Sequence, residues 1–175
     1  MNNGLLFLDI DGVVNTFMIG DEPFNSRAGG IKRGSFYFDM GSPSEYRVSN
    51  KQALLWVSKL CIDYKLDIVI SSSWLIGNEL DKIKFSLYSS GLSKEVNIIG
   101  GVSPNLCCHR GLAIELWLEE HKIDLNKTPI VILDDDCDMA GSEIDLTPYL
   151  VKTDTYVGFS HRDYLKASEL LNKEE

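Results

Sequence analysis

The sequence lacks any apolar run near the roughly 20 residues that a membrane-spanning helix needs. Its first four residues carry no basic group, and the apolar run at residues 5–8 is too short for the hydrophobic part of a signal peptide. From these two absences we expect a protein that has no membrane partner and works in the cytoplasm.

Cysteine is also scarce, with only Cys61, Cys107, Cys108 and Cys137 among 175 residues. None of them forms a CxxC pair, so the sequence predicts neither a zinc site nor a disulfide framework. Reduced thiols fit the expected cytoplasmic location.

Basic residues are outnumbered by acidic ones, 17 to 26, which gives a formal net charge of −9. A general nucleic-acid binder is usually basic, so this balance argues against one. The argument has limited weight, because several of the acidic residues belong to a candidate site and would be offset there by a bound cation.

Short apolar runs alternate with longer amphipathic ones, and no internal repeat or linker interrupts them. We expect strands at residues 5–8, 67–70, 96–99, 130–133 and 149–152, with Gly100-Gly101 closing the third. We expect helices at residues 49–64, 79–89, 111–121 and 160–171, with Ser49 and Ser160 as N-caps and Gly91 as a stop. The alternation predicts one α/β domain over residues 1–175, with a parallel sheet covered by helices on both faces.

Three of these predicted strands end in polar clusters, namely Asp9-Ile10-Asp11, Ser71-Ser72-Ser73 and Asp134-Asp135-Asp136-Cys137-Asp138. The carboxyl ends of parallel strands lie at one edge of a sheet, where ligands bind. Clustered carboxylates repel one another unless they are solvated or bound to a metal ion, and Mg²⁺ prefers oxygen ligands. An acidic turn or a solvated acidic loop would explain either cluster alone, but two such clusters after apolar strands favour a metal site.

Residues 15–48 do not follow the alternation and are rich in glycine, aromatic and turn-forming residues. We expect a loop or hairpin that serves as a flap, or minimal cap, over the site. Residues 24–38 hold Arg27, Lys32 and Arg33, four aromatic residues and no acid. That mixture suits a nucleotide or a single-stranded nucleic-acid end, although a solvated loop would have the same composition.

The motifs, in their order, resemble those of the haloacid dehalogenase (HAD) superfamily of phosphohydrolases. DIDGV at residues 9–13 resembles the first motif, SSSW at 71–74 the second, HRG at 109–111 the third and LDDDCD at 133–138 the fourth. Together with VKTD at 151–154 and Gly158, they are similar to the small HAD domains of bacterial and phage RNA-repair proteins. The resemblance implies a three-layer α/β/α, Rossmann-like fold.

The resemblance also implies roles for the residues that match the motifs. Asp9 would attack phosphorus, and Asp11 would act as general acid and base. Ser72, or Ser71, would bind the phosphoryl group, and Arg110 would balance its charge. Arg110 stands where a lysine is more common, and Val13 replaces a frequent threonine. Further substrate contacts are expected from Ser73, His109 and the three basic residues of the flap.

The cofactor implied by the resemblance is Mg²⁺. Its ligands would be Asp9, the backbone carbonyl of Asp11, and Asp134, with Asp135 or Asp138 binding directly or through water. Trp74 would either line the site or be a half-buried aromatic residue without a function.

We therefore expect a Mg²⁺-dependent phosphomonoesterase with an aspartyl-phosphate intermediate, acting on a nucleotide or a polynucleotide end. Alternatives are a phosphatase of small metabolites or phosphoproteins, a phosphotransferase, or a HAD-like binding module without activity. Intact Asp9 and Asp11 argue against the inactive module.

Overall fold

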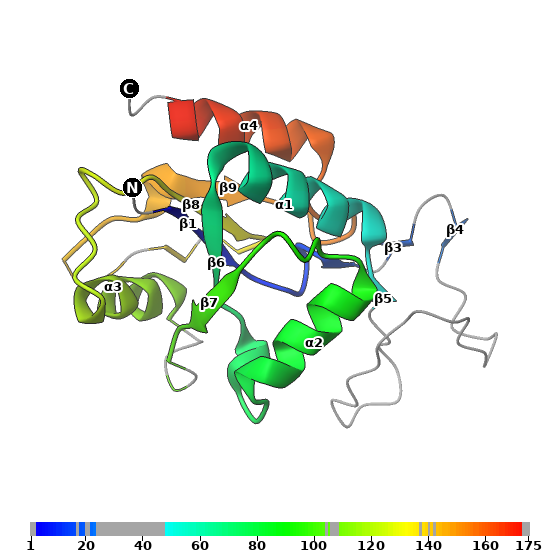
Figure 1. Ribbon diagram of the computed structural model, residues 1–175, viewed down its shortest axis with the longest axis horizontal. Coiled ribbons are helices and arrows are strands. Elements are labelled where there is room, and N and C mark those ends of the chain that lie inside the picture. The colour runs from blue at the N-terminus through cyan, green and yellow to red at the C-terminus, as the bar shows by residue number, and fades with distance from the viewer. Residues whose placement is uncertain are drawn as a thin grey trace.

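A five-stranded parallel sheet forms the centre of the molecule in the computed structural model (Figure 1). The structure describes residues 3–16, 18–19, 22–23, 48–103, 105, 109–136, 138–139, 141 and 143–172. In sheet order, the strands are β7 (Ile98–Gly101), β6 (Leu66–Ile70), β1 (Gly4–Leu8), β8 (Ile130–Asp134) and β9 (Leu150–Lys152). The first strand in the sequence is thus the central one, and every neighbouring pair is parallel.

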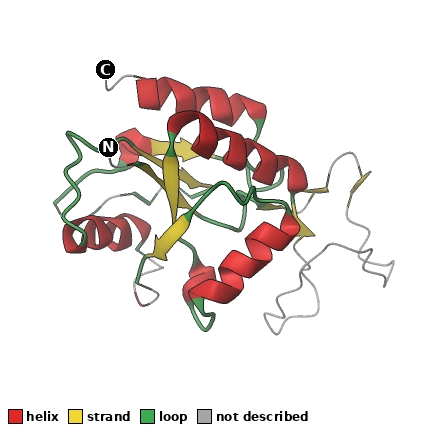
Figure 2. Ribbon diagram, in the orientation of Figure 1, coloured by secondary structure: helices red, strands yellow, loops and turns green. Residues whose placement is uncertain are grey.

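Helices cover both faces of this sheet (Figure 2). They are α1 (Lys51–Tyr64), α2 (Leu80–Ser90), α3 (Arg110–Glu120) and α4 (His161–Leu171). One apolar cluster joins the sheet to α1, α2 and α4, and the second joins it to α3. This is the three-layer α/β/α, Rossmann-like fold that the sequence predicts.

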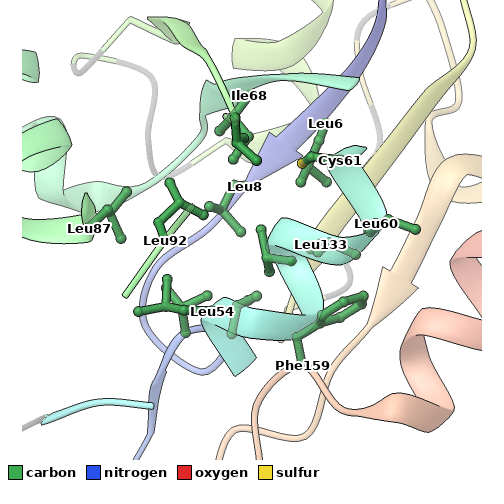
Figure 3. Close-up of a cluster of buried hydrophobic side chains, with 14 of the residues drawn as sticks. Leu6, Leu8, Leu54, Leu60, Cys61, Ile68, Leu87, Leu92, Leu133 and Phe159 are labelled. Carbon is green, nitrogen blue, oxygen red and sulfur yellow. The ribbon is translucent and has the colours of Figure 1, made fainter. Parts of the chain in front are cut away.

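Strand β1 supplies side chains to both clusters, because successive residues of a strand point to opposite faces. Leu6 and Leu8 pack under α1 with Leu54 and Leu60, as Figure 3 shows. Phe7 points to the other face and packs edge-to-face against the ring of Trp117, with the two ring centroids 5.5 Å apart. All five residues of β1 are buried, so the strand that leads into Asp9 is fixed from both sides.

Helix α1 begins one residue later than the sequence predicts. Ser49 is not its cap, since it belongs to the short strand β5 (Val48–Ser49) and pairs with Asn15. Asn50 caps the helix instead, and its side chain accepts hydrogen bonds from the backbone N–H groups of Gln52 (3.0 Å) and Ala53 (3.1 Å). The prediction for α4 is confirmed, because Ser160 and Asp163 form a capping box.

The predicted bounds of two strands are wrong, by two residues for one strand and by one residue for the other. Gly100 and Gly101 belong to β7 rather than closing it, and the strand begins at Ile98. Gly100 lies beside the Trp117 ring, which belongs to the core on that face of the sheet. Strand β9 begins at Leu150, because the preceding residues Thr147–Tyr149 form a 3₁₀ helix with a proline in its first turn.

Short antiparallel pairs are described at the two ends of the predicted flap. Strand β2 (Asn15–Thr16) pairs with β5, and β3 (Met18–Ile19) pairs with β4 (Glu22–Pro23). The remainder of residues 15–48 lies outside the described residues, so the flap and the single-domain boundaries stay predictions. Among the helices that are described, none is long and apolar enough to cross a membrane.

Candidate active site

Asp9 directly follows β1, with β6 on one side of that strand and β8 on the other. Its backbone N–H donates to the carbonyl oxygen of Leu133 at 3.0 Å, which continues the ladder between β1 and β8. The Asp9 side chain is only 6% exposed. Asp9 therefore stands at the centre of the edge where the parallel strands end, as predicted from its place after the first strand.

Two carboxylates of the fourth motif join Asp9. Asp134 is the last residue of β8 and is fully buried, and Asp135 follows it. Each of the three can place a carboxylate oxygen within 4.8 Å of the others. Asp138 is exposed and is not in this group, although its backbone carbonyl accepts a hydrogen bond from the N–H of Gly111. Of the two alternatives for the further ligand, the geometry favours Asp135.

Arg110 bridges the two buried carboxylates from the first residue of α3. Its Nε lies 2.9 Å from Oδ2 of Asp134, and one terminal nitrogen lies 3.5 Å from Oδ1 of Asp9. The arginine side chain is itself only 12% exposed. The basic residue expected from the third motif thus reaches the acids of the first and the fourth.

Burial raises the pKa of the Asp9 carboxyl from 3.8 to about 7. The Arg110 charge opposes this shift, Asp134 adds to it, and a hydrogen bond from the Ser72 side chain opposes it. Burial likewise raises the pKa of Asp134, again against the Arg110 charge. One guanidinium does not neutralise both carboxylates. A further cation bound here would therefore stabilise their ionised forms.

The oxygen atoms in this cluster fit a divalent metal ion. Among the described residues, Oδ1 of Asp9 and Oδ2 of Asp134 are buried and accept no well-aligned hydrogen bond. Asp135 supplies a third carboxylate within reach of the same point. A hard cation such as Mg²⁺ prefers an all-oxygen set of this kind. The cluster that the sequence predicts as a metal site has suitable ligands.

The three serines after β6 lie in different surroundings. Ser72 is buried and donates to Asp9, and its oxygen accepts from the backbone N–H of Trp74 at 3.4 Å. Ser71 is also buried, and its hydroxyl finds no partner within the described part of the chain. Ser73 is exposed. The geometry favours Ser72 as the hydroxyl nearest the reacting group, while its role stays a prediction.

Asp11 is held by two side-chain N–H groups. Its Oδ2 accepts from Nε1 of Trp74 at 3.1 Å, and its Oδ1 accepts from Nδ2 of Asn15 at 3.2 Å. Trp74 therefore contacts a candidate catalytic residue, which favours its being part of the site, while its function stays a prediction. The sequence analysis did not predict the hydrogen bond from Asn15 to Asp11. An amide four residues after an acid in a tight turn is a signal that could have suggested it.

The segment after β9 supplies two further contacts that the motifs did not assign. The Thr153 hydroxyl donates to the backbone carbonyl of Gly12 at 2.9 Å, and the Thr155 hydroxyl donates to Oδ2 of Asp135 at 2.7 Å. The threonines hold the turn after Asp9 and one candidate metal ligand. Thr153 lies within the VKTD segment of the resemblance, whereas Thr155 is indicated in the sequence only by its position after the strand next to β8.

Of the remaining predicted residues that the structure describes, His109 is not brought into the cluster. His109 is exposed at the N-cap position of α3, and its side chain makes no capping hydrogen bond. Arg27, Lys32 and Arg33 lie outside the described residues, so their contacts with substrate stay predictions.

Comparisons with curated proteins and with solved structures give no match. Residues 5–164 match the family model described as the HAD domain in Swiss Army Knife RNA repair proteins. The matched range includes all four motifs, the acidic cluster around Asp9 and the segment after β9. The chain therefore belongs to this family of haloacid dehalogenase domains.

Proposed function

We propose that the chain is a metal-dependent phosphomonoesterase in which Asp9 is the nucleophile. The observation that carries the proposal is the placement of Asp9, buried after the central strand and in contact with Arg110. Asp134 lies in the same cluster, and Asp11 follows two residues later. Membership of a HAD family supports phosphohydrolase chemistry at this position.

The reaction would proceed in two displacements. An oxygen of Asp9 attacks phosphorus, the bond to the leaving oxygen breaks, and a protonated Asp11 gives its proton to that oxygen. Water then attacks the aspartyl-phosphate and gives a proton to Asp11, and the bond between Asp9 and phosphorus breaks. Arg110 and Ser72 lie beside Asp9, where they can hold the phosphoryl oxygens during both steps.

Asp9, Asp134 and Asp135 would hold the cofactor, for which we propose Mg²⁺. When bound, a divalent ion stabilises negative charge on the phosphoryl oxygens. The protein residues supply the nucleophile and the proton transfer. The metal requirement is tested by removing divalent ions with a chelator and adding Mg²⁺ back, which should abolish and then restore turnover.

For the substrate we propose a phosphorylated RNA end, with a free nucleotide as the alternative. The description of the family, which names RNA repair proteins, supports an RNA end. The basic and aromatic residues between 24 and 38 offer groups that suit phosphates and bases. If RNA is the substrate, its apparent affinity should fall as salt concentration rises, because phosphate contacts release counterions.

The test uses purified protein with Mg²⁺ and three kinds of substrate: an aryl phosphate, nucleotides, and RNA oligonucleotides with a 3′- or 5′-phosphate. The Asp9→Asn variant should lose turnover and should no longer retain a phosphoryl group detectable by mass spectrometry. Asp81→Asn, an exposed acid on α2, is the matched control and should behave as wild type. Wild-type turnover by Asp9→Asn would exclude Asp9 as nucleophile.

A further inference from the structure

The contact between Asp11 and Trp74 joins two motif loops that are 63 residues apart in the sequence. Trp74 lies in the 3₁₀ helix Ser73–Leu75, which follows β6 directly. Its backbone is held at both ends, by the N–H bond to Ser72 Oγ and by the Asn78 side chain, which donates to the Trp74 carbonyl at 2.9 Å. The indole therefore reaches Asp11 from a fixed support.

The second donor to Asp11 is also fixed. Asn15 is 3% exposed, and its backbone carbonyl accepts from the N–H of Gly12 at 2.7 Å. Its side-chain oxygen accepts from the Ser49 hydroxyl at 3.4 Å, which orients the amide so that its NH₂ group points to Asp11. The two carboxylate oxygens of Asp11 are thus held from two different segments of the chain.

We propose that Trp74 is a positioning residue for proton transfer by Asp11, with Asn15 holding the other oxygen. This inference rests on the proposed phosphatase function. A proton can be delivered in the transition state only if the carboxyl group lies within hydrogen-bond reach of the leaving oxygen. Asp11 has two rotatable side-chain bonds, and the two N–H donors fix both of them. Trp74 acts through Asp11 and needs no contact with phosphorus.

The proposal predicts a dependence on the leaving group. An alkyl phosphate releases a poor leaving group that needs the proton from Asp11, whereas p-nitrophenyl phosphate releases a stable anion that needs it little. The ratio kcat/KM reports the steps up to and including the first displacement, so it isolates this proton transfer from hydrolysis of the aspartyl-phosphate. A variant that folded poorly would have a lower kcat/KM for the alkyl phosphate and for p-nitrophenyl phosphate alike.

The decisive variant is Trp74→Phe, which keeps an aromatic ring and removes the N–H donor. We expect kcat/KM for glycerol phosphate to fall about tenfold, a part of the ~10²–10⁴-fold that a general acid supplies. The value for p-nitrophenyl phosphate should change less than about threefold. Trp117→Phe is the matched control, since Trp117 is 6% exposed and Trp74 8%, and it should keep the wild-type ratio between the two substrates. Equal losses on both substrates, or no loss on either, would overturn the proposal.

Nuclear magnetic resonance tests the contact without any turnover. Trp74→Phe identifies the indole N–H signal of Trp74, and Asp11→Ala should shift this signal and speed its exchange with solvent. An unchanged signal would show that the hydrogen bond does not form in solution and would overturn the inference. If wild type hydrolyses neither of these phosphate esters, nor a nucleotide, nor a phosphorylated RNA end, the proposed function fails, and the positioning role fails with it even where the contact is present.

Discussion

Gly12 and Asp135 lie so close together that a β-carbon on Gly12 would overlap the Asp135 carboxylate. Gly12 also has a φ of +75°, a conformation that other residues adopt only with strain. The first acidic motif thus packs directly against the fourth. Asp135 has room to join Asp9 and Asp134 only because the residue at position 12 has no side chain.

Gly12→Ala is expected to weaken both metal binding and the fold. The left-handed backbone alone should cost about 1–2 kcal/mol of unfolding free energy, and the overlap with Asp135 should add about 1 kcal/mol or more. Mg²⁺ affinity should fall about tenfold or more, because Asp135 must move. Urea unfolding and titration calorimetry measure the two effects.

Gly77→Ala is the matched control for this change. Gly77 has a φ of +79°, but a β-carbon there meets no atom within 4 Å. This variant should show the backbone cost alone and keep wild-type Mg²⁺ affinity. Equal metal affinity in the two alanine variants would mean that Asp135 is not held against Gly12 when metal binds.

Thr155→Val should lower Mg²⁺ affinity by about tenfold, because it removes the hydroxyl that orients Asp135. Valine has nearly the same shape, so the variant should fold. Thr155→Ser restores the hydroxyl and should restore the affinity. If serine and valine give the same affinity, the hydrogen bond to Asp135 does not contribute to metal binding.

Metal binding should depend on pH because of Asp9. Its pKa of about 7 in the metal-free protein, above the ordinary 3.8, means that folding favours the protonated form. This contribution to stability is present below pH 4 and is lost as pH rises through about 7. A metal ion must displace the proton, so Mg²⁺ affinity should increase between pH 6 and 8, by at most about tenfold per unit.

Calorimetry at several pH values, in buffers of different ionisation enthalpy, measures both the affinity and the number of protons released. Asp9→Asn cannot titrate at this position and should bind Mg²⁺ more weakly, with little pH dependence across the same range. A wild-type affinity that stays constant from pH 6 to 8 would show that Asp9 is already ionised before metal binds.

The elements that the sequence predicts well are those set by local patterns. An apolar run that ends in Asp9 identifies β1, and the Ser160 and Asp163 pair identifies the start of α4. The helix cap at Asn50 was missed because Ser49 is an equally good cap in local terms. Ser49 is excluded only by its pairing with Asn15, which is 34 residues away.

The same limit applies to the candidate site. Short motifs identify Asp9, Asp134 and the neighbouring Arg110, since each lies at the end of a strand or at the start of a helix. The contacts of Trp74 with Asp11 and of Thr155 with Asp135 depend on how separate loops meet in space. No spacing within the sequence fixes those distances, so these partners emerge only from the fold.

Arg110 is the cation that the two buried acids share, and removing it should leave them uncompensated. Arg110→Met keeps much of the side-chain length without the charge. We expect the metal-free variant to lose about 3 kcal/mol or more of unfolding free energy near pH 7, because breaking a buried ion pair leaves charge without a partner. Mg²⁺ should restore part of this loss, since a bound ion neutralises the same carboxylates.

Lys82→Met is the control for this last change. Lys82 pairs with Glu79 at 3.4 Å on the surface of the molecule, where an ion pair contributes at most about 1 kcal/mol. Urea unfolding of both variants, with and without Mg²⁺, gives four comparisons with wild type. If Arg110→Met were no less stable than Lys82→Met, the guanidinium would not be what balances Asp9 and Asp134. If Mg²⁺ stabilised Lys82→Met as strongly as Arg110→Met, its effect would not depend on the charge lost from the cluster.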